Sequence, residues 1–181
     1  IALHGRGSSA DLDKYFWMPV TKQGWMLALP QSSQLGSPNS FVWDDAAKTE
    51  AEMIVHFAEI IRKYPIDPER IILAGFSQGA ARAIHLALKG VIRSRGFLAV
   101  VPGKVLLDDL ENLTRFAKDA NLRGYLVAGG KDPRYEVFQT AHRLLNAHGI
   151  RCAMEEHPTI GHEFPPDFEQ SLEKGIQFIL E

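Results

Sequence analysis

The chain passes from an expected strand into an expected helix at Ile71-Ile72-Leu73-Ala74-Gly75-Phe76-Ser77-Gln78-Gly79-Ala80-Ala81. The β-branched apolar run is typical of a buried strand, and the small residues that follow are typical of a helix packed on a sheet. Glycines two residues before and two residues after Ser77 leave room for a sharp turn that exposes its Oγ. The stretch therefore predicts a nucleophilic serine; the alternative is a serine that only caps the helix.

The same alternation of apolar and helical segments runs along the whole chain. It predicts an α/β fold with a mostly parallel central sheet and helices on both faces. With no linker or repeat, residues 1–181 form one expected domain. Because the first residues look like the end of a strand, we expect the N-terminal strand or strands to be missing from the sequence. Strands are expected at 1–3, 25–29, 70–74, 96–101, 124–128 and 151–156, and helices at 45–63, 78–89, 108–119, 135–147 and 166–180.

Composition excludes several classes of partner. The chain carries 20 basic and 22 acidic residues, a net charge of −2, and no lysine or arginine run that would favour nucleic acid. No apolar stretch reaches the roughly 18 residues of a membrane span. No metal or cofactor is expected, and Cys152, the only cysteine, is expected to be buried. We expect a cytoplasmic protein, and a homodimer is one assembly that the sequence allows.

A nucleophilic serine needs a histidine base, and the base needs an acid that orients it. Asp132 follows the expected strand 124–128 in a glycine-rich turn, where its alternative role is to cap the next helix. His162 lies in a loop bounded by glycine and proline after the last expected strand. His157 is the competing base, but it lies at the strand end, where the pleat would set its orientation. Position therefore favours Asp132 as the acid and His162 as the base.

Two backbone N–H groups would be needed to stabilise the oxyanion. The glycine-rich segment His4-Gly5-Arg6-Gly7 leaves the first expected strand, and the helix after the serine begins at Gln78. We assign the two donors to the amides of Arg6 and Gln78. Aromatic residues in expected loops near this edge suggest an apolar substrate pocket, although the alternative is that they only cover the sheet. The candidates for substrate binding are Trp17, Trp43 and Phe76.

These pieces, in this order, form a recognisable set. His-Gly-x-Gly at 4–7, Gly-Phe-Ser-Gln-Gly at 75–79, Gly-x-x-Asp at 129–132 and Gly-His at 161–162 resemble the phospholipase/carboxylesterase branch of the α/β-hydrolase superfamily. That branch includes the acyl-protein thioesterases. The resemblance covers essentially the whole chain. It implies an α/β-hydrolase fold, a Ser77–Asp132–His162 triad and an oxyanion hole at Arg6 and Gln78.

The sequence departs from the family pattern at three places. Ser8 stands where the family often has an acidic residue, and Ala80 replaces a common glycine after the nucleophile. Pro133-Arg134-Tyr135 replaces the usual valine-proline after the acid, at a place that would shape the acyl pocket. None of these changes removes a reacting group.

The expected function is hydrolysis of carboxylic esters through an acyl-enzyme on Ser77. Small soluble esters are the first expectation, with acyl thioesters and lysophospholipids behind them. A non-catalytic binding protein with the same fold is the alternative from another class.

Overall fold

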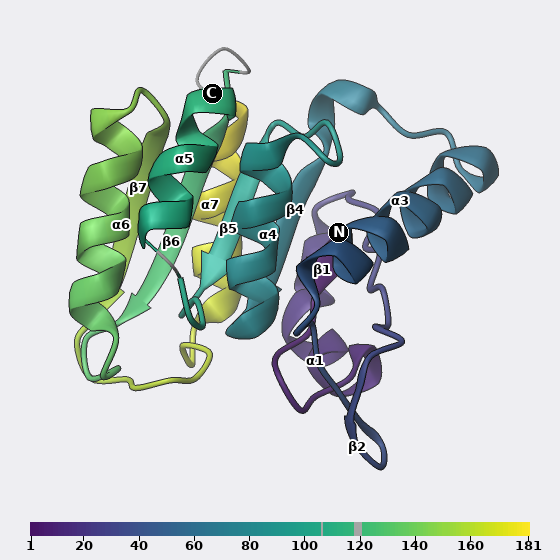
Figure 1. Ribbon diagram of the computed structural model, residues 1–181, viewed down its shortest axis with the longest axis horizontal. Coiled ribbons are helices and arrows are strands. Elements are labelled where there is room, and N and C mark those ends of the chain that lie inside the picture. Colours follow the sequence, from purple (N-terminus) through teal and green to yellow (C-terminus); the bar gives the residue numbers. More distant parts are fainter. Residues whose placement is uncertain (106, 118–120) are drawn as a thin grey trace.

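A computed structural model describes residues 1–105, 107–117 and 121–181 (Figure 1). Its centre is a parallel sheet of five strands in the order β1-β4-β5-β6-β7. The expected class, an α/β fold with a mostly parallel sheet, is confirmed. The strands are β1 (Ala2–Leu3), β4 (Ile72–Phe76), β5 (Gly96–Val100), β6 (Arg123–Gly129) and β7 (Arg151–His157).

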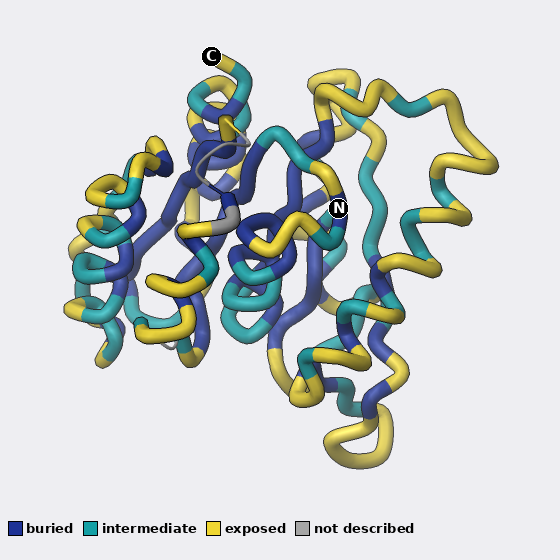
Figure 2. Tube along the Cα trace, turned by 45° about the horizontal axis from the view of Figure 1, so that its top comes forward, coloured by how far each residue is buried: buried dark blue, intermediate teal, exposed yellow. Residues whose placement is uncertain are grey.

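Helices cover both faces of this sheet (Figure 1). On one face, α4 (Gln78–Lys89) packs on β4 and β5, α6 (Tyr135–Ala147) packs on β6 and β7, and α5 (Leu107–Ala117) lies between these two helices. On the other face, α7 (Phe168–Leu180) packs on β5 and β6 and contacts α2 (Pro19–Lys22). The central strands β4, β5 and β6 are buried along nearly their whole length (Figure 2). Burial on both faces explains why these three strands are mainly apolar runs, whereas the edge strand β7 carries exposed polar residues.

Three further segments lie around β1, at one edge of the sheet (Figure 1). They are α1 (Ala10–Trp17), α3 (Ala46–Lys63), and the antiparallel pair β2 (Leu35–Ser37) and β3 (Ser40–Phe41). Asp45 caps α3 by accepting a hydrogen bond from the amide of Lys48 at 3.0 Å. Only Thr49 and Met53 of α3 are buried.

The structure corrects some expected elements. Residues 25–29 form no strand; one backbone hydrogen bond, from Ala2 to Ala28 at 2.9 Å, joins this segment to β1. Trp17 lies in α1 rather than in a loop. The expected helix 108–119 appears as α5, and the end of that range falls outside the described residues. No helix within the described ranges is long and apolar enough to cross a membrane.

Candidate active site

The parallel sheet brings the predicted nucleophile, acid and base to one edge. Ser77 follows β4, Asp132 lies three residues after β6, and His162 lies in the loop after β7. The carboxyl ends of parallel strands meet at the same edge, where sites of open α/β sheets generally lie. Residues far apart in the sequence therefore come within hydrogen-bond reach of one another.

Ser77 lies in a tight and strained turn between β4 and α4. Its φ of 52° and ψ of −116° belong to a backbone region that residues other than glycine rarely adopt. The chain folds back so closely that a Cβ at Gly75 would lie 2.4 Å from the carbonyl carbon of Gly79. Backbone hydrogen bonds hold the turn, from Ser77 to Val100 at 3.0 Å and from Gly103 to Ser77 at 2.7 Å. The backbone thus enforces this conformation at Ser77.

A continuous hydrogen-bonded chain joins the three candidates. His162 Nε2 lies 2.7 Å from Ser77 Oγ, and His162 Nδ1 lies 2.6 Å from Asp132 Oδ2. The competing base, His157, lies elsewhere: its Nε2 is 3.3 Å from Ser171 Oγ. With the imidazole proton on Nδ1, Asp132 accepts that hydrogen bond and Nε2 is free to accept the hydroxyl proton of Ser77. This arrangement can generate a nucleophilic alkoxide.

The environment of Asp132 favours its ionised form. Its side chain is fully buried, and burial alone would raise the pKa of the carboxyl. Hydrogen bonds from the backbone and side chain of Arg134 and from His162, together with the Arg134 charge, nevertheless hold this pKa below its ordinary value. The carboxylate is therefore available as a permanent partner for the imidazole.

The two candidate oxyanion donors, Arg6 and Gln78, line the same cavity as Ser77. Within the described ranges, neither backbone amide has a hydrogen-bond acceptor. Their side chains share one partner, because the Asp44 carboxylate accepts from the guanidinium of Arg6 and from the Gln78 side chain. The two N–H groups thus remain candidates for binding an oxyanion.

The cavity beside Ser77 measures about 450 Å³ and has two kinds of wall. Apolar residues of α4 and α5 form one part, including Ile84, Leu110 and Leu113. Charged residues form another, including Arg82, Lys104, Asp109 and Arg134. Cavities of this size hold small molecules.

The three aromatic candidates lie elsewhere. Trp17 and Trp43 are buried, and the Trp43 indole donates to the His4 carbonyl at 3.0 Å. Phe76 is half-buried, and its ring centre lies 5.4 Å from that of His162. None of the three is among the described residues that line the 450 Å³ cavity. Trp43 thus contacts the loop that begins at His4, and Phe76 lies against the ring of the candidate base.

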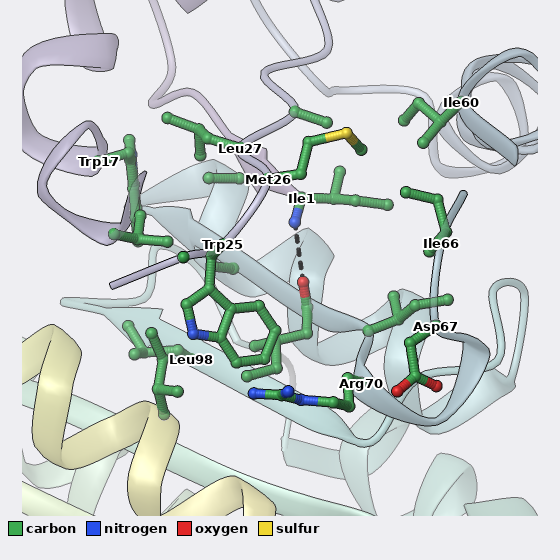
Figure 3. A pocket seen from close by; sticks show the side chains of 18 of the residues that line it. Ile1, Trp17, Trp25, Met26, Leu27, Ile60, Ile66, Asp67, Arg70 and Leu98 are labelled. Atoms are coloured by element: carbon green, nitrogen blue, oxygen red, sulfur yellow. Dashed lines mark hydrogen bonds between the residues drawn. The ribbon is translucent and has the colours of Figure 1, made fainter. Parts of the chain in front are cut away.

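A second cavity, of about 280 Å³, lies at the β1 edge of the sheet (Figure 3). Its walls are mainly apolar and include Trp17, Trp25 and Ile60. The hydrogen bond drawn in Figure 3 joins the backbone nitrogen of Ile1 to the carbonyl of Ile72 at 2.9 Å. No member of the Ser77–His162–Asp132 chain lines this cavity, so it is separate from the candidate site.

A model of the phospholipase/carboxylesterase family matches residues 37–180. The chain belongs to this family. No curated protein matches it. The matched range contains Ser77, Asp132 and His162, so family membership and the hydrogen-bonded chain concern the same part of the protein. The description of this family names phospholipases and carboxylesterases.

Solved structures share the fold of this chain. An uncharacterized protein from Bacillus cereus ATCC 10987 is 30% identical, with a TM-score of 0.92, over 99% of this chain and 59% of the other. This chain therefore spans 59% of the length of that protein. A phospholipase/carboxylesterase from Dyadobacter fermentans DSM 18053 is 19% identical, with a TM-score of 0.72, over 97% and 88% of the two chains. Zea mays acyl-protein thioesterase 2 is 18% identical, with a TM-score of 0.66, over 99% and 92%. At these lower identities the likeness concerns the fold alone.

Two residues at the site were not assigned a role from the sequence. Asp44 links the side chains of Arg6 and Gln78, and Arg134 contacts both Asp132 and His162. Each position carries a sequence pattern: Trp43-Asp44 resembles the tryptophan-aspartate site ahead of the family's long helix, and Arg134 departs from the family pattern. Neither pattern specifies the hydrogen-bond partners of Asp44 or Arg134, because both sets of contacts depend on side-chain geometry.

Proposed function

We propose that this protein is a carboxylesterase that forms an acyl-enzyme on Ser77, with His162 as the base and Asp132 as the orienting acid. The observation that carries the proposal is the hydrogen-bonded chain of 2.7 Å and 2.6 Å through the His162 ring. A serine that only caps α4 would need no such partner, and the Ser77 side chain makes no capping hydrogen bond. A non-catalytic binding protein would not need the Ser77–His162–Asp132 hydrogen-bonded chain.

The reaction proceeds by acyl transfer in two steps. His162 Nε2 takes the hydroxyl proton as Ser77 Oγ attacks the ester carbonyl, and the amides of Arg6 and Gln78 stabilise the oxyanion. The tetrahedral intermediate collapses, and His162 gives the proton to the departing alcohol. Water then attacks the acyl-enzyme with His162 again as base, which releases the acid and restores Ser77. Asp132 keeps the imidazole proton on Nδ1 throughout.

The substrate class follows from the cavity and the family. A volume of about 450 Å³ with apolar and charged walls favours small esters with a short acyl chain. Names of structural neighbours include a carboxylesterase and an acyl-protein thioesterase, so acyl thioesters are the second candidates. Lysophospholipids are third, because their long chains exceed this cavity. A cytoplasmic location and a homodimer also belong to the proposal, to be checked by cell fractionation and light scattering.

Labelling with a fluorophosphonate probe tests the nucleophile directly. Wild-type protein should be labelled and Ser77→Ala should not, whereas equal labelling of both would overturn the assignment. A panel of p-nitrophenyl esters of increasing acyl length, with an acyl thioester beside it, then ranks the substrate classes. His157→Ala serves as the matched control for His162→Ala. The proposal expects loss of hydrolysis only in the His162 variant.

A further inference from the structure

The cavity beside Ser77 is lined by more positive than negative side chains. Among the described residues, four basic and two acidic ones form its charged wall: Arg6, Arg82, Lys104, Arg134, Asp44 and Asp109. In the whole chain acidic residues outnumber basic ones, and the net charge is −2. The excess of positive charge is therefore a property of this cavity and not of the protein as a whole.

The four cations of the cavity differ in their partners. Arg6 and Arg134 each donate to a carboxylate. Arg82 and Lys104 make no ion pair within the ranges 1–105, 107–117 and 121–181. Lys104 is exposed in the segment after β5, whereas Arg82 is half-buried on α4. An anion that entered the cavity would thus meet two cations whose charge no contacting carboxylate of these ranges offsets.

The backbone holds the Arg82 guanidinium in place at the cavity wall. Its Nε donates to the carbonyl of Trp43 and its Nη2 to the carbonyl of Asp44, each at 2.8 Å, and no described residue accepts from Nη1. Carbonyl groups orient a guanidinium without neutralising its charge. Burial lowers the pKa of Arg82, although the charges of Asp44, Asp45 and Glu50 oppose that change. A bound anion would offset the cost of burying this cation.

Arg82 lies on the same face of α4 as the candidate oxyanion donor. Gln78 and Arg82 are neighbours at the i, i+4 spacing, and Ala81 and His85 of this face also line the cavity. Ser77 directly precedes α4, and at 1.5 Å per residue it lies about 7.5 Å from Arg82 along the helix axis. A substrate with its carbonyl at Ser77 can therefore place a group a few atoms further on against Arg82.

The two acids of the cavity wall leave this positive charge in place. The Asp44 carboxylate already accepts from the side chains of Arg6 and Gln78, and these contacts hold its pKa below the ordinary value. Asp109 is exposed in the first turn of α5, where the helix N-terminus favours negative charge and solvent screens it. Both negative charges are thus compensated without Arg82.

We propose that the substrate carries an anionic group, and that Arg82, assisted by Lys104, binds this group while the ester carbonyl lies at Ser77. The inference rests on the proposed function, because it names the substrate class of that site. The class is a short ester with a carboxylate a few atoms from the scissile carbonyl, in its acyl part or in its alcohol part. Half-esters of short dicarboxylic acids have the first form. Arg82 is then the residue that determines specificity.

The experiment compares two pairs of esters that differ only in charge. Monoethyl glutarate and its neutral amide test the acyl part, and 4-acetoxybenzoate and 4-acetoxybenzamide test the alcohol part. Wild-type protein should prefer the anionic member of at least one pair by about tenfold in kcat/KM. Equal values within both pairs would overturn the proposal. The pair that shows the preference identifies the part of the ester that carries the anion.

Variants assign the preference to its residues. Arg82→Gln should raise KM for the preferred anionic ester about tenfold, with a much smaller effect on its neutral amide. Lys104→Gln should have a smaller effect in the same direction. Arg93→Gln is the matched control, because Arg93 is exposed, pairs with Glu69 and is outside the cavity wall. An Arg82→Gln variant that loses activity equally on both members would show a structural role and overturn the proposal.

Folding and turnover are separated from binding in two further tests. If thermal unfolding shows that Arg82→Gln does not fold, Lys104→Gln decides, since its side chain is exposed: an unchanged preference would overturn the proposal. Calorimetry with the free anions glutarate and 4-hydroxybenzoate requires no hydrolysis. Binding of either to Ser77→Ala that weakens about tenfold in Ser77→Ala/Arg82→Gln would support the inference even if no ester were cleaved. Absence of cleavage alone would refute the proposed function.

Discussion

The side-chain amide of Gln78 donates a hydrogen bond of 2.7 Å to the carboxylate of Asp44. The same carboxylate accepts from Arg6, so it joins the two residues whose backbone amides are the candidate oxyanion donors. One donor comes from the loop after β1 and the other from the start of α4. Their relative position therefore depends on a side chain from a third segment.

Asp44→Ala should lower kcat about tenfold with little change in KM. The reason is that less firmly held N–H donors stabilise the oxyanion of the transition state less well, while substrate binding changes little. Asp44→Asn should be milder, since its side-chain oxygen still accepts from Gln78. Steady-state kinetics on one p-nitrophenyl ester measures both. Asp109→Ala, at another acid of the same cavity, is the control. A loss confined to KM would contradict the positioning of the donors by Asp44.

Asp132→Asn should reduce kcat by about 10⁴, because an amide can stabilise the wrong imidazole tautomer and carries no charge. The buried side chain has nearly the same shape as the original, so the variant should fold. Single-turnover kinetics and fluorophosphonate labelling rates measure the effect. A variant within tenfold of wild type would show that the acid lies elsewhere.

The same residue should make stability depend on pH. Since the native pKa of Asp132 is below its ordinary value of 3.8, the unfolded chain binds this proton more readily. Its contribution to the unfolding free energy is present above about pH 4 and is lost as pH falls through the native pKa. Urea unfolding between about pH 5 and pH 3 should therefore show a smaller acid loss in Asp132→Asn than in wild type. Equal losses would exclude this contribution.

Gly79→Ala should destabilise the fold by about 3 kcal/mol. A Cβ at this position would lie 2.2 Å from the carbonyl oxygen of Leu3 and 2.5 Å from that of His4. Both contacts are with backbone, which cannot rotate away, so β1 and α4 would have to separate. Thermal and chemical unfolding measure the change. Gly161→Ala is the control, because a methyl group there would meet no atom of the described residues within 4 Å beyond its chain neighbours.

Cys152 should react with a thiol reagent only when the protein unfolds. Burial raises the pKa of this thiol, so almost no thiolate forms in the native state. The rate of reaction with Ellman's reagent should follow the unfolding curve, and Cys152→Ala should keep full esterase activity. Rapid reaction of the native protein would show that β7 opens locally.

The sheet and its main helices could be predicted because their signals are local. β4, β5 and β6 are continuous apolar runs, and α4 and α6 begin and end where expected. The prediction of a strand at 25–29 was wrong because its composition suits a strand, whereas strand pairing depends on a partner that sequence does not reveal. α1 was not predicted, although Ser9 at its start is a capping residue.

The part of the site that depends on sheet topology could be predicted from the sequence. Loops after parallel strands converge, so sequence order and glycine-rich turns were enough to group Ser77, Asp132 and His162 in one predicted site. The contacts of Arg134 were not predictable, because they depend on how one long side chain folds back over a turn. Burial of Trp17 and Trp43 likewise depends on packing between segments distant in the sequence.

The strained backbone of Ser77 has an evolutionary consequence. At φ 52° and ψ −116°, glycine has less backbone strain than serine. Selection for folding alone would therefore favour glycine at this position. Serine at this place opposes that preference and is expected to persist only while its hydroxyl is useful to the organism. In a lineage that no longer needed the chemistry, residue 77 would be among the first positions of the chain to drift.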